Sequence, residues 1–198
     1  MANVFDTIIT QGVRAGQIPA RTNAARTWYR DAAAGKSRIN ERKLMRDAER
    51  LTNTIFPGSM YMFFYDPKYK DTLPYYDRFP LIFPFRVESD RFWGINLHYL
   101  SLQHRAILMD GLYDLSNNNR YDETTKLRLS YSMLNRAAKF RYFKPCVKQY
   151  LFDKTQSRFM YIYPSEWDIA LFLPTERFQK STKSNVHRQS SLQVQSGS

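Results

Sequence analysis

The sequence predicts an α+β fold, built as a small, strongly bent β-barrel of the SH3-like kind that carries helical additions. Three observations favour it. Apolar and aromatic runs bounded by turn residues, which are typical of strands, occupy residues 59–100 and 157–173. Apolar residues at helical spacing occupy residues 22–52 and 101–139. The chain has 198 residues, of which 43% are hydrophobic and 16% aromatic, so it can bury a sizeable core.

The chain is expected to divide into three parts. Residues 1–56 form a helical N-terminal extension, which Pro57-Gly58 ends. Residues 57–175 form the α+β core domain, with a helical insertion between its early and late strands. Residues 176–198 are rich in Ser, Gln, Lys and Arg and lack apolar periodicity. This composition predicts a basic, flexible C-terminal tail that is able to order on a partner.

Two helices are expected in the N-terminal extension. Thr22 or Asn23 can cap a helix that Gly35 ends. A second helix is expected over residues 37–52, where the apolar stripe is broken and most other positions are charged. Such a helix has a weak core face, and its mixture of acids and bases predicts contact with protein rather than with a polyanion.

The early strands of the core are expected at residues 60–65, 79–87 and 92–100. Pro80 and Pro84 mark the second of them as an edge or bulged strand. Residues 72–78, between the first two strands, are expected to form an ordered loop packed by its own aromatic side chains.

The second half of the core is expected to begin with helices at residues 101–115 and 122–139. A short helix or strand follows at residues 147–152. Strands are then expected at residues 157–163 and 169–173, with a turn between them.

The net charge of +12, from 30 Lys and Arg against 18 Asp and Glu, is spread over all three parts of the chain. A charge of this size attracts polyanions in a salt-dependent way. The same charge would also serve solubility or docking against an acidic protein surface, and both of these roles stay open.

The expected compartment follows from what the sequence lacks. Cys146 is the single cysteine, so no intramolecular disulfide forms and a reducing compartment is the simpler expectation. No run approaches the roughly 20 apolar residues that span a bilayer, and the N-terminus lacks the pattern of a signal peptide. We therefore expect a soluble protein with no membrane contact.

The candidate binding surface is an acid-free stretch, residues 124–152, in which cations alternate with aromatic residues. Its cations, the predicted DNA-binding residues, are Lys126, Arg128, Arg136, Lys139, Arg141, Lys144 and Lys148. Its rings are Tyr131, Phe140, Tyr142, Phe143, Tyr150 and Phe152. Exposed rings can stack on unpaired bases, but we expect these rings to belong to the core. The cations are expected to contact phosphates and so to recognise DNA without reading its base sequence.

Catalysis is not expected, and neither a cofactor nor a metal is predicted. Three histidines and one cysteine provide no metal site of credible spacing, and no glycine-rich phosphate loop is present. Asp110 and Asp114, four residues apart on one helical face, are the best metal-binding pair for a nuclease. A solvated helix face is the favoured interpretation, and a nuclease stays as an alternative. Cys146 lies near Lys144 and Lys148 but has no histidine near it in sequence, so a nucleophilic role is weaker still.

Four strings carry a resemblance to proteins of T4-like tailed phages. They are Tyr65-Asp-Pro-Lys68, Leu73-Pro-Tyr-Tyr-Asp-Arg-Phe-Pro-Leu81, Gly94-Ile-Asn-Leu-His-Tyr-Leu100 and Ser165-Glu-Trp-Asp-Ile-Ala170. Over residues 59–175 the chain resembles the family of DNA end protectors, which also serve as head-completion proteins. The helical N-terminus and the basic tail are not matched to that family.

The resemblance implies a virion protein, present in the host cytoplasm during assembly, that binds the end of packaged DNA. There it shields the end from host exonuclease and completes the head or neck. Its implied partners are DNA and other virion proteins of the portal, neck or tail, and an oligomeric ring is one possible assembly. The alternative is a structural component of the neck, the tail-completion machinery or the baseplate that acts through protein contacts only.

Overall fold

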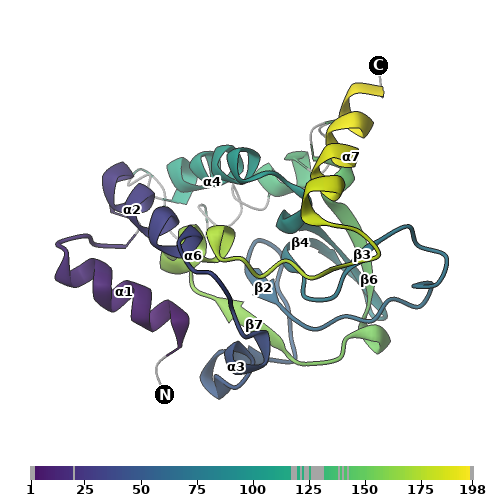
Figure 1. Ribbon diagram of the computed structural model, residues 1–198, viewed down its shortest axis with the longest axis horizontal. Helices are drawn as coiled ribbons and strands as arrows, with labels where there is room; N and C mark the ends of the chain where they lie inside the picture. The colour runs from purple at the N-terminus through teal and green to yellow at the C-terminus, as the bar shows by residue number, and fades with distance from the viewer. Residues whose placement is uncertain are drawn as a thin grey trace.

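The computed structural model describes residues 3–19, 21–116, 120, 122, 125, 132–137, 139, 141 and 143–196. It has the mixed helix and sheet content that the sequence predicted, with helices gathered around one main sheet (Figure 1). The predicted Lys126 and Arg128, together with Tyr131, Phe140 and Tyr142, lie outside the described residues.

The main sheet is antiparallel throughout and has the order β1-β7-β2-β4-β5-β6. Its strands are β1 (Leu51–Thr52), β2 (Met60–Met62), β4 (Leu81–Val87), β5 (Arg91–Asn96), β6 (Val147–Leu151) and β7 (Phe159–Ile162). The register of β4 and β5 shifts between Pro84 and Arg86, which confirms the predicted bulge.

The predicted closed barrel of the SH3-like kind is not found in the described part of the chain. The edge strands β1 and β6 are not paired with each other, so the sheet is open. Of the residues predicted as a final strand, 169–173, all but Leu173 instead belong to helix α6 (Trp167–Phe172), and Leu173 is its C-cap. Most of α6 is buried, and a short apolar run buried on several sides has no periodicity that separates a helix from a strand.

The N-terminal helices are α1 (Val4–Arg14), α2 (Asn23–Ala34) and α3 (Glu41–Leu44), followed by the 3₁₀ turn η1 (Ala48–Arg50). The Thr22 hydroxyl accepts a hydrogen bond from Ala25 N, so the predicted cap of α2 is confirmed. The long helix predicted over residues 37–52 is wrong, because only the short helices α3 and η1 and the strand β1 form there. Its broken apolar stripe leaves too little core face to hold a longer helix.

The sheet is buried on both faces. Met60 and Met62 of β2 point into the larger core, which the helices cover, while Tyr61 and Phe63 point into an aromatic cluster on the opposite face. This alternation follows from the two-residue period of a strand. Helix α4 (Leu102–Ser116) and the helical residues 132–137 lie between β5 and β6 in the chain, which confirms a helical insertion.

The C-terminal segment is ordered up to Ser196, so the predicted flexible tail is wrong for residues 176–196. Strand β8 (Phe178–Gln179) pairs with β3 (Tyr76–Asp77) in a second, two-stranded sheet. Helix α7 (Lys183–Ser196) then packs against the 3₁₀ turns η2 (Leu97–Tyr99) and η3 (Lys144–Cys146), far from α1 in the view of Figure 1. Buried polar contacts hold this segment in place. A prediction from apolar periodicity misses such contacts, because they involve polar side chains.

Candidate nucleic-acid interface

The described cations of the acid-free stretch lie on consecutive short elements. Arg136 lies near the end of the helical residues 132–137, Lys139 and Arg141 lie in turns, and Lys144 opens η3. Lys148, the second residue of β6, is half-buried. Two of the seven predicted cations lie outside the described residues, and the rest lie close together in the chain between α4 and β6.

Arg141 has a structural role in addition to its charge. Its guanidinium donates to the carbonyl oxygens of Val194 and Gln195 at the C-terminal end of α7, the second at 3.4 Å. Cations at this end of a helix bind the unpaired carbonyl groups and oppose the negative end of the helix dipole. Arg141 thus joins the acid-free stretch to α7, which the sequence did not indicate.

The aromatic residues of the stretch that the structure describes are core residues, as expected. Tyr150 is 4% exposed and stacks on Phe92 at a ring distance of 5.2 Å. Phe152 packs on the same cluster, and Phe143 packs on the larger core. These rings are not available for stacking on a base.

Lys148 lies in a pocket of about 410 Å³ that the sequence did not predict. Its Nζ lies 4.1 Å from the centre of the Tyr99 ring, a cation–π contact. Burial lowers the pKa of this amine, and Cys146 offsets part of that effect. Within the described part of the chain no carboxylate lies within ion-pair distance of Lys148, so its amine has no counter-ion there.

The pocket is formed by segments far apart in the sequence. Its walls are the loop from Tyr65 to Tyr76, strands β5 and β6, and Tyr99 of η2. Six tyrosines line it, namely Tyr65, Tyr69, Tyr75, Tyr76, Tyr99 and Tyr150. Residues 72–78 were expected to form an ordered aromatic loop, which is confirmed in part, because Tyr76 and Asp77 instead form strand β3. Nothing in the local pattern indicated that this segment faces Lys148.

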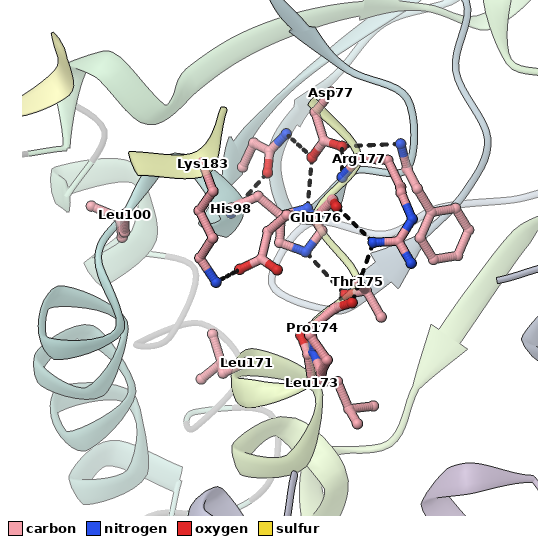
Figure 2. Close-up of polar contacts among 12 residues, drawn as sticks. Asp77, His98, Leu100, Leu171, Leu173, Pro174, Thr175, Glu176, Arg177 and Lys183 are labelled. Atoms are coloured by element: carbon pink, nitrogen blue, oxygen red, sulfur yellow. Dashed lines mark hydrogen bonds and ion pairs between the residues drawn. The ribbon is translucent and has the colours of Figure 1, made fainter. Parts of the chain in front are cut away.

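The carboxylate of Asp77 supports one side of the pocket, and both of its oxygens accept hydrogen bonds from the protein (Figure 2). It accepts hydrogen bonds from His98 Nδ1 at 2.6 Å and from Asn96 Nδ2 at 3.2 Å. It also accepts from the backbone N–H groups of Phe79 and Arg177, at 3.1 and 3.2 Å. These contacts bind β3 to β5 and to the C-terminal segment, so they fix the position of the pocket wall.

Asp77, His98 and Thr175 lie in a line that resembles a catalytic relay. His98 Nε2 lies 3.1 Å from Thr175 Oγ1 on the side of the ring opposite Asp77 (Figure 2). Both His98 and Thr175 have an exposed fraction of 0%. A nucleophile must reach its substrate, and Thr175 is covered. The arrangement therefore acts as a structural link between β3, η2 and the C-terminal segment.

A second buried network anchors the C-terminal segment through Arg105 on α4. Arg105 donates to the carbonyl oxygens of Leu100 and Leu171 at 3.0 and 2.7 Å, and to Glu176 at 2.6 Å. Lys183 at the start of α7 also contacts Glu176, at 2.6 Å (Figure 2). Glu176 thus connects the core helix to α7.

The loop of the pocket is fixed by the same segment. Lys180, which has a positive φ of 64°, extends its amine to the carbonyl oxygens of Lys70, Asp71 and Leu73 at 2.6, 3.0 and 3.1 Å. Three hydrogen bonds from one ammonium hold this turn of the loop in one conformation. The C-terminal segment therefore shapes the pocket as well as packing on the core.

Acid is expected to release α7, because two groups that hold it resist protonation in the folded state. Burial lowers the pKa of His187, whose Nε2 donates to the His98 carbonyl oxygen at 2.9 Å. Burial raises the pKa of Glu176, but His98, Arg105 and Lys183 together lower it below its ordinary value of 4.5. In both cases the unfolded chain takes up the proton first as the pH falls, so stability decreases with falling pH. The loss begins below the ordinary His pKa of 6.5 and steepens below 4.5.

Hydrogen exchange of residues 183–196 between pH 7 and pH 4 measures this release, after correction for the intrinsic rates. The variant His187→Gln keeps a side-chain donor but does not titrate. It should therefore lack the loss of protection that begins below pH 6.5 and keep the loss below pH 4.5. Protection that stays constant between pH 7 and pH 4 would contradict the assignment of these groups.

One member of the carboxylate pair of the nuclease alternative, Asp110, forms ion pairs with arginines. Asp110 Oδ1 lies 3.0 Å from Arg26 Nη2 and 2.8 Å from Arg30 Nη2, and both arginines also contact Asp168. Two guanidinium groups repel a divalent cation at this position. Within the described ranges, no three His, Cys, Asp or Glu side chains gather closely enough to hold a metal ion. The arrangement favours a structural role for Asp110.

Cys146 is buried at 0% exposure. Burial raises the pKa of its thiol to about 12, although Lys148 and Arg105 lower it in part. A thiol with such a pKa carries almost no thiolate at neutral pH, so the residue lacks the character of a nucleophile.

None of the helices in the described part of the chain combines the length and apolar character that crossing a bilayer requires. Arg42 and Lys43 of α3, and Arg38 and Arg46 beside it in the chain, are exposed cations. Glu41 of the same helix is turned inward and forms an ion pair with Arg177.

Comparison with known proteins identifies the family. A family model described as phage T4 terminal DNA protecting protein matches residues 1–195. No curated protein and no solved structure matches the chain. The match includes the helical N-terminus and most of the C-terminal segment, which the four sequence strings had left unmatched. The chain therefore belongs to the family of phage T4 terminal DNA protecting proteins, whose function is the protection of DNA ends.

Proposed function

We propose that this protein binds the terminus of packaged phage DNA through the cations of residues 136–148 and so denies exonucleases access to the end. The observation that carries the proposal is the run Arg136, Lys139, Arg141 and Lys144, four exposed cations in a stretch without Asp or Glu. Cations in such a run contact successive phosphates and release their counter-ions, which supplies affinity without sequence preference.

Protection of this kind needs no bond to be made or broken. An exonuclease starts at a DNA terminus. A protein bound to the terminal phosphates blocks the exonuclease sterically. We therefore propose that the protein acts as a binding component and not as an enzyme. The family description, which names protection rather than cleavage, supports this.

The experiment compares salt dependence in two matched variants. Replacing Arg136, Lys139 and Lys144 by Gln should weaken binding to linear DNA and reduce the slope of log affinity against log salt by up to about 3, since each lost phosphate contact removes about 1. The control replaces Arg14, Arg21 and Arg38, which lie on the N-terminal part, by Gln. It removes the same charge and should leave the slope close to that of the unmodified protein. Equal losses in the two variants would mean that net charge alone attracts DNA, and the proposed surface would be wrong.

We further propose that the protein resides in the virion, after assembly in the host cytoplasm, and completes the head or neck beside portal or tail proteins as a single copy or a ring. The exposed cations in and beside α3, whose Glu41 is paired internally with Arg177, support a second contact of this kind. Imaging of the virion with the protein labelled tests it. Density at the DNA exit of the head is expected, and density at the baseplate would favour a purely structural role instead.

A further inference from the structure

We propose that the tyrosine-lined pocket around Lys148 receives one unpaired nucleotide at the DNA terminus, with its base against Tyr69 and its phosphate near Lys148 and Lys68. This inference rests on the proposed binding of DNA ends and adds a reason why an end is preferred to continuous duplex.

The size and walls of the pocket suit a nucleotide. Its volume of about 410 Å³ lies in the range of about 300–1,000 Å³ that is typical of small-ligand sites. Of the tyrosines that line it, Tyr69 is 63% exposed, and Tyr75 and Tyr76 are half-buried. Every base has a π-face, so aromatic rings bind unpaired bases with little dependence on sequence.

The charge of the pocket suits a phosphate. Lys148 contacts the Tyr99 ring but has no carboxylate partner among the described residues, and Lys68 is exposed near Tyr69. Arg91 also lines the pocket, but it is paired with Asp90 at 2.6 Å. Asp77 is the one carboxylate among the described lining residues, and its oxygens accept four hydrogen bonds from the protein. An entering phosphate therefore meets two lysines, an arginine that is paired with Asp90, and one carboxylate that already accepts hydrogen bonds from the protein.

The pocket is held open before any ligand binds. Lys180 fixes the loop through the carbonyl oxygens of Lys70, Asp71 and Leu73, and an ion pair between Lys70 and Asp66 adds to it. Tyr65 Oη accepts from Leu151 N at 3.2 Å, which holds the start of the loop against β6. A preformed site avoids the cost of ordering a loop on binding.

The pocket also accounts for a preference for ends. Bases inside a duplex are stacked and paired, and taking one out costs a few kcal/mol, whereas an unpaired terminal nucleotide has no pairing to lose. A relaxed closed circle offers no such nucleotide. A single pocket that takes one unpaired base thus separates a terminus from continuous duplex, which phosphate contacts alone do not.

The test uses the full-length protein and three probes of one sequence. They are a short duplex with one unpaired 2-aminopurine nucleotide at each 3′ end, the same duplex with an abasic residue there, and a relaxed closed circle. The expected results are tighter binding of the first probe than of the second, and quenching of its fluorescence on binding. Tyr69→Ala should weaken binding of the first probe about fivefold to a hundredfold and remove the quenching, because stacking contributes about this much per base. It should leave binding of the abasic probe unchanged.

The matched control is Phe56→Ala, since Phe56 is 62% exposed but does not line the pocket. It should bind all three probes like the unmodified protein. Lys148→Met, which keeps the length of the side chain, should lower the salt slope for the first probe by about 1. If the first two probes bind alike and no quenching occurs, the pocket inference is wrong while end binding stands. If neither linear probe binds better than the circle, end binding itself is wrong.

Discussion

Replacing Arg105 by Ala is expected to lower the free energy of unfolding by about 3–5 kcal/mol, a large part of the roughly 5–15 kcal/mol of a typical domain. The guanidinium is completely buried and donates to three backbone carbonyl oxygens and to the Glu176 carboxylate. Its removal takes this donor from the Leu100 and Leu171 carbonyl oxygens, while the His98 carbonyl oxygen keeps the hydrogen bond from His187. Glu176 keeps a charge that Lys183 then balances without Arg105. Burial lowers the pKa of Arg105 and Glu176 raises it in part, as expected of a charge that depends on its partner.

Equilibrium denaturation in urea measures this loss, and Arg158→Ala is the control. Arg158 is exposed, so its replacement should change stability by no more than about 0.5 kcal/mol. Hydrogen exchange should also locate the damage, with α7 losing protection before the main sheet does. A loss below about 1 kcal/mol for Arg105→Ala would mean that the network contributes little.

Replacing Asp77 by Ala is expected to cost a similar amount, about 3–5 kcal/mol, and to open the loop of the pocket. Four donors lose their acceptor, and two of them are the backbone N–H groups of Phe79 and Arg177. Because Asp77 lies in β3, which pairs with β8, the two-stranded sheet should loosen as well. Urea denaturation measures the first effect, and limited proteolysis of residues 66–75 measures the second.

Asp71→Ala is the matched control for Asp77→Ala, since Asp71 is an exposed residue of the same loop. It removes the same charge but should leave both stability and the rate of cleavage unchanged. If the two variants are cleaved at the same rate, then Asp77 does not hold the loop.

Elements that depend on interactions between residues close in the chain could be predicted from the sequence. Thr22 caps α2 because its hydroxyl supplies an acceptor at the right position, and β4 and β5 form a hairpin around the polar turn that precedes Arg91. The family could also be predicted, because the four strings are distinctive. The described aromatic residues of the acid-free stretch belong to the core, as expected from the usual role of large apolar side chains.

Features that depend on polar contacts between residues far apart in the chain could not be predicted from the sequence. The C-terminal segment has little apolar periodicity, so a flexible tail was predicted, yet Glu176, Lys180 and His187 hold it through buried or multiple hydrogen bonds. The pocket was missed for the same reason, because Tyr69 and Lys148 are far apart in the chain and meet only through the sheet.

The measurement that tests the central claim most directly is digestion of linear DNA by an exonuclease in the presence of the protein. We predict that enough protein to occupy both ends preserves the full-length DNA, and that the variant without the charges of Arg136, Lys139 and Lys144 protects poorly. We also predict that an endonuclease cuts a closed circle equally fast with and without the protein. Full degradation of the linear DNA at saturating protein, or equal protection of the circle, would contradict the claim that this protein acts by occupying DNA ends.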